Sequence, residues 1–345
     1  MELTKQDLHS LALGSTLLAT GGGFPFESKH QKLKELNKNN SLHLISTNDL
    51  CDDDLVCAIS GIGSADNTHN LNFDQALIAG LKTMQELLGR NINALIPGEI
   101  GIENIIFELA SKLNLPVLDA DTAGGRAVPE MTHDTFFLAD ETILPVVLVS
   151  LTGETFVIDE KQTPLFEKRG EIEKIARAKA LETPEKTILI FSHGKPIHKI
   201  KAIASLNSLS RSIEIGTALK SLNLTQILQD LKQICRAELI TTAKVTSVFK
   251  NKDEDFLKTI VTLRTPQGIM DLIIKNEILA LQQDSNLIAH IPDLICLLDL
   301  KTFLPIHSSE IEKGSFFAVL RIPAIKQWQT EKARELFGIS YVKNI

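Results

Sequence analysis

The sequence has few aromatic residues and no excess of positive charge. Aromatic side chains make up 5% of the 345 residues, with one Trp and one Tyr, and the formal net charge is −7. Proteins that bind nucleic acids normally carry clustered Lys and Arg, and those that bind single strands stack bases on aromatic rings. We therefore expect no nucleic-acid partner.

Motifs built on cysteine, histidine or serine are also missing. The four cysteines have no CxxC spacing, and the nine histidines are dispersed, with no HExxH motif. His193 and His198 are five residues apart, which one helix face does not explain, and His133 beside Asp134 comes nearest to a ligand pair. We expect reduced thiols, no metal and no cofactor, with a loosely held ion as the alternative. No GxSxG motif marks a nucleophilic serine.

Long apolar runs are absent as well. The longest, "TILPVVLVSL", contains Pro145 and is too short to span a membrane. The N-terminal "MELTKQDLHSLALG" has acidic and polar residues where a signal peptide needs a basic start and an apolar run. We therefore expect a cytoplasmic protein without membrane contact.

What is present is an alternation of short apolar runs with amphipathic patterns. Strands are expected at 55–60, 93–97, 115–120 and 143–150, and helices at about 73–88 and 102–113. This order is typical of parallel strands joined by crossover helices. Beyond residue 236, β-branched segments separated by turns indicate an antiparallel sheet. We predict an α/β fold with an open, mostly parallel sheet domain at 1–165, a helical connection at 166–235 and a β-rich antiparallel domain at 236–345.

Three consecutive glycines follow a predicted helix over residues 5–18. Because Thr20 and Gly21–Gly23 come after a helix, the strand–loop–helix order of a nucleotide-binding loop is missing. One interpretation is a helix C-terminus, where glycine accepts a left-handed backbone. The other is an anion-binding nest of backbone amides, because three glycines exceed what one cap requires.

Polar, glycine-bearing loops follow the first three predicted strands. In an open α/β sheet the ligand binds outside the carboxyl ends of the strands, so we expect these loops to lie together. The first, "SGIGSADNTHN", offers Gly61 and Ser64 for ligand binding, and the second, "PGEIGIEN", offers Glu99 and Asn104. The alternatives are a plain surface loop for the first and a helix N-terminus for the second.

The third loop, "DADTAGGRAVPE", carries most of the chemistry. Asp119 and Asp121 are two residues apart, so both carboxylates project to one side of an extended backbone. Like charges that close raise one pKa, which suits a general acid or base. Arg126 is near enough to bind a carboxylate or a planar acceptor, and Glu130 follows. The alternative is a turn with capping aspartates and a structural ion pair.

Segments along nearly the whole chain resemble the S-methyl-thiohydantoin desulfurase domain family. They are "LALGSTLLATGGGFP", "PGEIGIEN", "LPVLDADTAGGRAVPEM", "SRSIEIG", "KNEILAL" and "IPDLICLLD", in the order of the family. The most specific block is Asp119–Glu130. The chain departs from the family at Thr122-Ala123, where a glycine-led pair is usual, and at Ile102, where a second glycine is common.

The resemblance implies hydrolysis of a hydantoin-like or S-methyl-thiohydantoin ring, with release of methanethiol. It implies that Asp119 or Asp121 activates water and that the other carboxylate or Glu130 supplies a proton. Arg126 and the amides of Gly21–Gly23 would stabilise the anionic ring. Asn276, Glu277 and Asp293 match family positions and are expected to close the cleft.

The resemblance also suggests a partner, because members of the family are often encoded beside hydantoinase/oxoprolinase-type proteins. The competing hypothesis is therefore a non-catalytic partner or ligand-binding subunit of a hydantoinase/oxoprolinase-like enzyme. In either case we expect a small heterocyclic ligand and a homo-oligomer.

Overall fold

The computed structural model describes residues 1–39, 41–63, 71–159, 169–252 and 257–343. These residues form two compact units. The first comprises Met1–Lys5, Gln31–Gly125 and Glu130–Ser208, and the second comprises Gln6–His30, Arg126–Pro129 and Leu209–Ile345. Each unit is thus built from separate chain segments, whereas the boundaries drawn from the sequence divide the chain into consecutive ones. None of the described helices is long and apolar enough to cross a bilayer.

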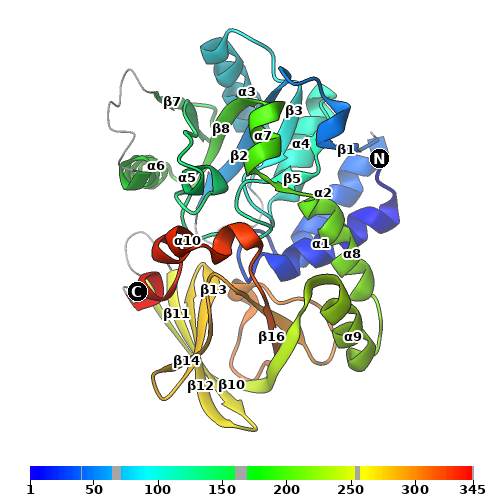
Figure 1. Ribbon diagram of the computed structural model, residues 1–345, viewed down its shortest axis with the longest axis vertical. Coiled ribbons are helices and arrows are strands. Elements are labelled where there is room, and N and C mark those ends of the chain that lie inside the picture. The colour runs from blue at the N-terminus through cyan, green and yellow to red at the C-terminus, as the bar shows by residue number, and fades with distance from the viewer. Residues whose placement is uncertain (40, 64–70, 160–168, 253–256, 344–345) are drawn as a thin grey trace. The chain divides into compact units, whose positions relative to one another are not determined.

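The first unit is built on a mixed seven-stranded sheet, and Figure 1 labels β7, β8, β2, β3 and β1 among its strands. Its strands in spatial order are β1 (Leu44–Ile45), β4 (Val117–Leu118), β3 (Ala94–Pro97), β2 (Leu55–Ile62), β8 (Ile188–Pro196), β6 (Val146–Ser150) and β7 (Thr155–Ile158). The pairs β1–β4, β4–β3 and β3–β2 are parallel, and the parallel arrangement of β2, β3 and β4 confirms the sequence prediction, whereas β1 was not predicted. A separate ribbon pairs β5 (Ala120–Asp121) with β9 (Ser205–Leu206).

The other half of this sheet is antiparallel, so the prediction of a mostly parallel sheet holds at one end only. β8 runs antiparallel to both β2 and β6, and β6 runs antiparallel to β7. The tight turn at Gly153, with φ 87°, lets the chain fold straight back from β6 into β7. Both faces of β6 are covered, by α3 (Asp74–Leu88) and α6 (Arg169–Glu182). An apolar run buried on both faces does not reveal its direction.

Helices cover both faces of the first sheet. The predicted helices at 73–88 and 102–113 are confirmed as α3 and α4 (Glu103–Leu113), which pack beside each other. Gly80 of α3 lies against the Phe191 ring of β8, where an added Cβ would come within 2.0 Å of the ring. On the opposite face, α6 and α7 (Ile197–Ile203) bury Val56 and Ala58 of β2. Two further short elements of this unit are η1 (Thr47–Asp49) and α5 (Thr135–Leu138).

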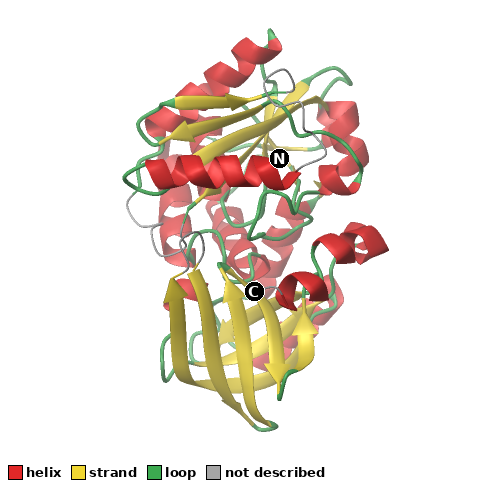
Figure 2. Cartoon of the chain, turned by 90° about the vertical axis from the view of Figure 1, so that its left-hand side faces the viewer, coloured by secondary structure: helices red, strands yellow, loops and turns green. Residues whose placement is uncertain are grey.

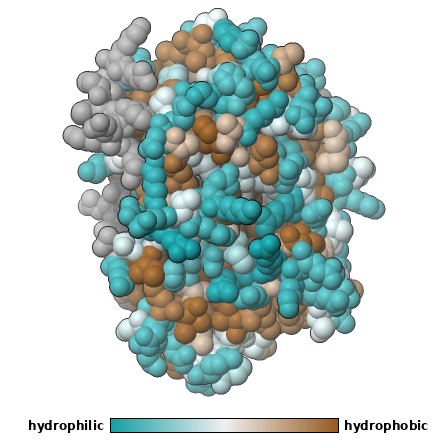
Figure 3. All heavy atoms as spheres, viewed as in Figure 1, coloured by the Kyte–Doolittle hydropathy of each residue, from teal (hydrophilic) through white to brown (hydrophobic). Residues whose placement is uncertain are grey.

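The second unit contains the predicted antiparallel sheet, which Figure 2 shows as a curved half-barrel. Its strands in spatial order are β14 (Asn286–His290), β13 (Glu277–Gln283), β12 (Gly268–Lys275), β11 (Leu257–Thr265), β10 (Glu238–Lys252), β16 (Phe316–Ile322) and β15 (Leu294–Asp299). One face buries a core that includes Val245, Leu263 and Phe317. The other leaves the cross-strand pair Phe249 and Ile260 exposed, and Figure 3 shows apolar atoms over part of this sheet.

Helices complete the second unit. They are α1 (Lys5–Leu18), α8 (Ser208–Ala218), α9 (Leu224–Cys235), α10 (Glu331–Leu336) and α11 (Ile339–Lys343), with the short η3 (Ser308–Glu310) and η4 (Lys326–Gln329). α2 (Phe26–Asn39) begins in this unit and continues into the first. The predicted helix 5–18 is confirmed as α1.

Two glycines let α1 and α8 touch through their backbones. A Cβ at Gly14 would lie 1.8 Å from the Ser212 carbonyl oxygen, and one at Gly216 would lie 1.7 Å from that of Ser10. Real Cβ atoms do not approach backbone oxygens so closely, so any larger residue would force the helices apart. The glycines in "LALG" and "SIEIG" therefore set this helix crossing.

Gly216→Ala should accordingly destabilise the second unit by about 1–3 kcal/mol, because overpacking outweighs the better helix propensity of alanine. Gly170→Ala is the matched control, since Gly170 lies in α6 with nothing within 4 Å of an added Cβ. We expect that control to be neutral or stabilising. Thermal unfolding followed by circular dichroism compares the two variants. Equal melting temperatures would mean that the two helices have room to separate.

Candidate functional site

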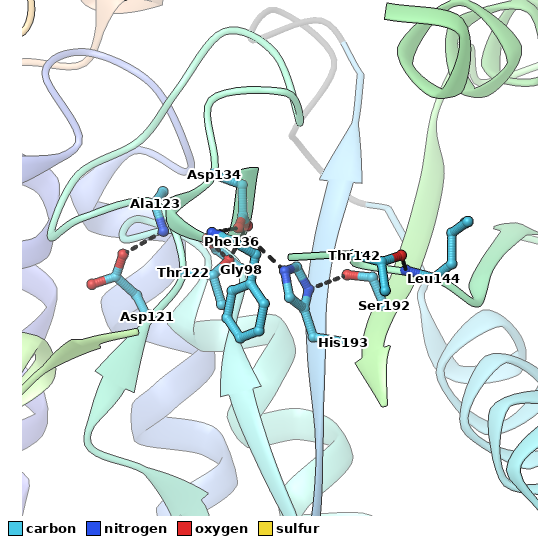
Figure 4. A network of polar contacts seen from close by, with 10 residues as sticks. All are labelled: Gly98, Asp121, Thr122, Ala123, Asp134, Phe136, Thr142, Leu144, Ser192 and His193. Carbon is cyan, nitrogen blue, oxygen red and sulfur yellow. Dashed lines mark hydrogen bonds and ion pairs between the residues drawn. The ribbon is translucent and has the colours of Figure 1, made fainter. Parts of the chain in front are cut away.

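Asp121 lies in β5, just beyond the carboxyl end of β4, with its carboxyl group fully buried. Its Oδ1 accepts hydrogen bonds from the backbone amide of Ala123 at 2.8 Å (Figure 4) and from that of Gly125 at 3.0 Å. The Gly125 amide also lies 2.9 Å from Oδ2. Gly124 and Gly125 have φ values of 85° and 74°, which allow the chain to wrap around the carboxyl group.

Burial raises the pKa of Asp121 to about 7, and the amides of Gly125, Ala123 and Gly124 with the Ser208 hydroxyl oppose the shift. A carboxyl group with such a pKa is present in both protonation states near neutral pH. It can therefore accept a proton from water and return it within one reaction cycle.

The cause of this shift differs from the predicted one. Asp119 is half-buried, its amide donates to Ile45 O at 2.8 Å and its carbonyl accepts from Asn207 N at 2.8 Å. The groups that shift the pKa of Asp121 do not include the Asp119 charge. Loss of hydration, not a like charge, therefore makes the Asp121 carboxyl group a weak acid.

A buried polar network adjoins Asp121 through its neighbour Thr122 (Figure 4). Thr122 Oγ1 lies 2.5 Å from Asp134 Oδ2 and 3.0 Å from the carbonyl oxygen of Gly98. His193 Nε2 lies 3.2 Å from Asp134 Oδ1, and Ser192 Oγ lies 2.8 Å from His193 Nδ1. The Asp134, Ser192 and His193 side chains are all buried.

The other predicted residues of the first unit lie at several places around this carboxyl edge. The loop after β3 is bonded to β2 from Gly98 N to Ile59 O at 2.7 Å, and Thr122 Oγ1, beyond β4, lies 3.0 Å from Gly98 O. Gly61 is in β2 opposite Leu189, with ordinary space for a Cβ. Ser64 lies outside the described residues.

The residues predicted in the second and third loops differ in burial. Glu99 and Glu130 are half-buried, and Glu130 Oε2 lies 3.3 Å from Thr132 Oγ1. Asn104 is in the first turn of α4 and is 7% exposed. Its buried Oδ1 has no hydrogen-bond partner within the described part of the chain.

In the second unit, the turn after α1 is tied to the β-sheet by its carbonyl oxygens. Thr20 O accepts from Ile278 N at 2.8 Å, Gly21 O from Ser308 N at 2.9 Å, and Gly23 O faces His307 Nε2 at 3.1 Å. Thr20, Gly21 and Gly23 have φ values of 51°, 90° and 67°. The Gly22 amide donates to Ala19 O at 2.8 Å, as at a helix end.

Glu277 packs directly on this glycine turn. An added Cβ at Gly22 would lie 2.2 Å from Glu277 Oε1, so only glycine leaves room for the carboxyl group. Asn276 precedes Glu277 with a left-handed φ of 60°, which asparagine tolerates better than most residues. Asp293 Oδ1 accepts from Ala324 N at 2.9 Å.

Arg126 is fully buried in the second unit. Its Nη1 donates to Pro292 O at 2.5 Å and its Nε to Ala127 O at 3.1 Å, and the guanidinium carbon lies 4.8 Å from the centre of the Phe337 ring. Burial lowers the pKa of Arg126 to about 10, while Glu277, Cys296 and Asp293 oppose the shift. The group stays charged at neutral pH.

Several buried polar atoms of this unit have no hydrogen-bond partner among the described residues. They include Arg126 Nη2, Thr20 Oγ1 and Asn276 Oδ1. A buried donor or acceptor left unpaired is costly, so such atoms mark places where a ligand or water would bind. In the same described ranges, no three His, Cys, Asp or Glu side chains are arranged to hold a metal ion.

The residues that the sequence reasoning missed are Thr122, Asp134, Ser192 and His193. His193 and Asp134 were considered only as metal ligands. They are 59 residues apart, and no spacing rule connects them. The short segment "SHG" within a β-branched run was the available signal, because a glycine inside a strand often accompanies a bulge.

Two family models match nearly the whole chain. A model described as the S-Me-THD-like N-terminal domain matches residues 6–160, and one described as the S-Me-THD-like C-terminal domain matches residues 167–342. A crystal structure of a protein from Chromobacterium violaceum, a structural genomics target, has 19% sequence identity and a TM-score of 0.80. The match covers 100% of this chain and 97% of that one, which shows a shared fold. No curated protein matches the chain.

Proposed function

Because the chain belongs to the S-Me-THD-like family, we propose that it is a hydrolase that acts on a small hydantoin-like or S-methyl-thiohydantoin ring. The observation that carries the proposal is the buried Asp121 carboxyl group, whose pKa is raised to about 7. Water is a poor nucleophile near neutral pH, and a positioned base with such a pKa makes it a better one.

In the proposed reaction, Asp121 accepts a proton from water while the water oxygen bonds to the ring carbon that carries the S-methyl group. The electron pair of the C=N bond moves to the ring nitrogen, which takes up a proton. The C–S bond then breaks as the new hydroxyl oxygen forms a C=O bond and gives up its proton. The sulfur takes the proton held by Asp121 and leaves as methanethiol, the hydroxyl proton restores the acid that protonated the ring nitrogen, and the ring becomes a hydantoin. Asp119 or Glu130 is the proposed second acid.

Ring recognition is proposed for the unpartnered atoms of the second unit. A hydantoin-type ring carries a carbonyl oxygen next to an N–H group. Arg126 Nη2 is a donor suited to the carbonyl, Asn276 Oδ1 is an acceptor suited to the N–H, and Thr20 Oγ1 can serve either group. Gly21–Gly23 and Glu277 would lie beside the ring bound by these three residues. Further contacts with the ring by Glu99, Asn104 and Gly61 remain predictions.

The direct test is incubation of the full chain with an S-methyl-thiohydantoin. We expect thiol release, measured with a thiol reagent, to match hydantoin formation, measured by mass spectrometry. Binding of the ring without any turnover would contradict the proposal. Turnover that begins only when a hydantoinase/oxoprolinase-like protein is added would favour the accessory-subunit hypothesis instead.

A further inference from the structure

We propose that Asp134 and His193 are positioning residues that hold the 121–125 turn, and with it the Asp121 carboxyl group, in its working arrangement. The inference rests on the proposed function, since it gives these two buried side chains a role in the reaction assigned to Asp121. Neither side chain touches the Asp121 carboxyl group itself, so the effect passes through Thr122 (Figure 4).

Thr122 is fixed through both its side chain and its backbone. Its hydroxyl lies 2.5 Å from Asp134 Oδ2, and its carbonyl oxygen accepts from the Thr135 amide at 2.8 Å. Thr122 separates Asp121 from Ala123, whose amide binds the Asp121 carboxyl group. A shift of Thr122 would therefore move one of the donors that stabilise the charged form of Asp121.

Each hydrogen bond to Asp134 has a donor if the His193 ring carries a proton on Nε2, and the single hydroxyl proton of Thr122 then points to Asp134 and not to Gly98 O. Asp134 Oδ1 then accepts from His193 Nε2 and from the Phe136 amide, and Oδ2 accepts from Thr122. Ser192 Oγ donates to His193 Nδ1. His193 thereby fixes the orientation of Asp134. Phe136 packs its ring against the imidazole, with centroids 4.5 Å apart.

The backbone at His193 supports a role beyond packing. The residue has a left-handed φ of 52°, although it lies within β8. Val56 pairs with Lys195 but Ala58 pairs with Ser192, so β8 carries one extra residue between these pairs. Such bulges re-aim side chains and often occur beside active sites. Glycine would take this conformation more easily, yet the position is occupied by the residue that bonds Asp134.

Ser192, His193 and Asp134 also contain the groups of a nucleophilic triad. Ser192 is 4% exposed and Asp134 is 6% exposed. In a Ser-His-Asp triad the serine bonds Nε2 and the aspartate bonds Nδ1 of the histidine, whereas here Ser192 faces Nδ1 and Asp134 faces Nε2. A role in positioning therefore fits this arrangement better than a role in covalent catalysis.

The test follows the titration of the Asp121 carboxyl group by carbon-13 NMR in the full chain, for the wild type and for Thr122→Val and Asp134→Asn. We expect the apparent pKa of Asp121 to rise by about half a unit or more in both variants, because amide donors to the charged carboxylate weaken. Thr122→Ser should restore the wild-type value. Thr187→Val, which removes another buried hydroxyl of this unit, is the control.

Unchanged titration in both variants, with lower thermal stability only, would overturn the proposal. Because the NMR titration needs no turnover, it separates this proposal from the hydrolase proposal. Where turnover is measurable, His193→Ala should lower kcat more than it changes KM, and Ser192→Ala should have a smaller effect. Loss of all turnover in Ser192→Ala, with the fold intact, would make Ser192 the nucleophile and contradict the positioning role.

Discussion

Asp121→Asn is expected to lower the turnover of an S-methyl-thiohydantoin by about 100- to 10,000-fold, the range that a general base contributes. The fold should survive, because the amide oxygen of asparagine can still accept from the Ala123 and Gly125 backbone amides. What the variant lacks is a group that takes a proton from water. The measurement is the rate of thiol release at saturating substrate, with Asp271→Asn as a control in β12.

The same variant checks the electrostatics of the site. The folded-state pKa of Asp121 is raised from 3.8 to about 7, so the folded chain binds this proton more tightly than the unfolded chain does. The contribution of Asp121 to the free energy of unfolding therefore falls as the pH rises from about 4 to about 7. Asp121→Asn should remove that fall. An unchanged rate of thiol release in the variant would exclude Asp121 as the base.

Arg126→Met is expected to weaken the binding of hydantoin by about 10- to 100-fold, the range for losing a hydrogen bond to a charged group. The substitution removes the buried Nη2 donor and the bond to Pro292 O. Methionine has a similar length, and its thioether packs well against an aromatic ring such as Phe337. Titration calorimetry with hydantoin measures the dissociation constant.

The matched control for Arg126→Met is Arg264→Gln, which removes an exposed arginine of β11 in the same unit. We expect the control to bind hydantoin as the wild type does. Equal affinities of Arg126→Met and the wild type would show that the buried guanidinium serves only the structure, through Pro292 and Phe337.

The elements predicted best from the sequence are those in which apolar residues recur at a regular spacing and polar or glycine residues mark the end. α1, α3 and α4 begin and end close to the predicted residues, because their apolar positions recur at helical spacing. β2, β3 and β4 are parallel, as the alternation with helices indicates. The direction of β6 could not be predicted, because direction depends on which strand lies alongside and not on the apolar run itself.

Only those site residues that occur together in one loop of the sequence could be predicted. The sequence identified Asp121 because two aspartates, two glycines and an arginine occur together in one loop. It attributed the raised pKa to Asp119, since burial of a polar loop residue is a tertiary effect. The contact of His193 with Asp134 could not be predicted, because the two residues come from distant segments. In addition, a histidine in a left-handed bulge has no sequence pattern of its own.

The pH dependence of kcat/KM for S-methyl-thiohydantoin hydrolysis tests the central claim most directly. If the buried Asp121 carboxylate is the base, the rate should rise about tenfold per pH unit below an inflection near pH 7 and level off above it. An inflection near pH 4, or a rate that does not change between pH 5 and 8, would contradict the account.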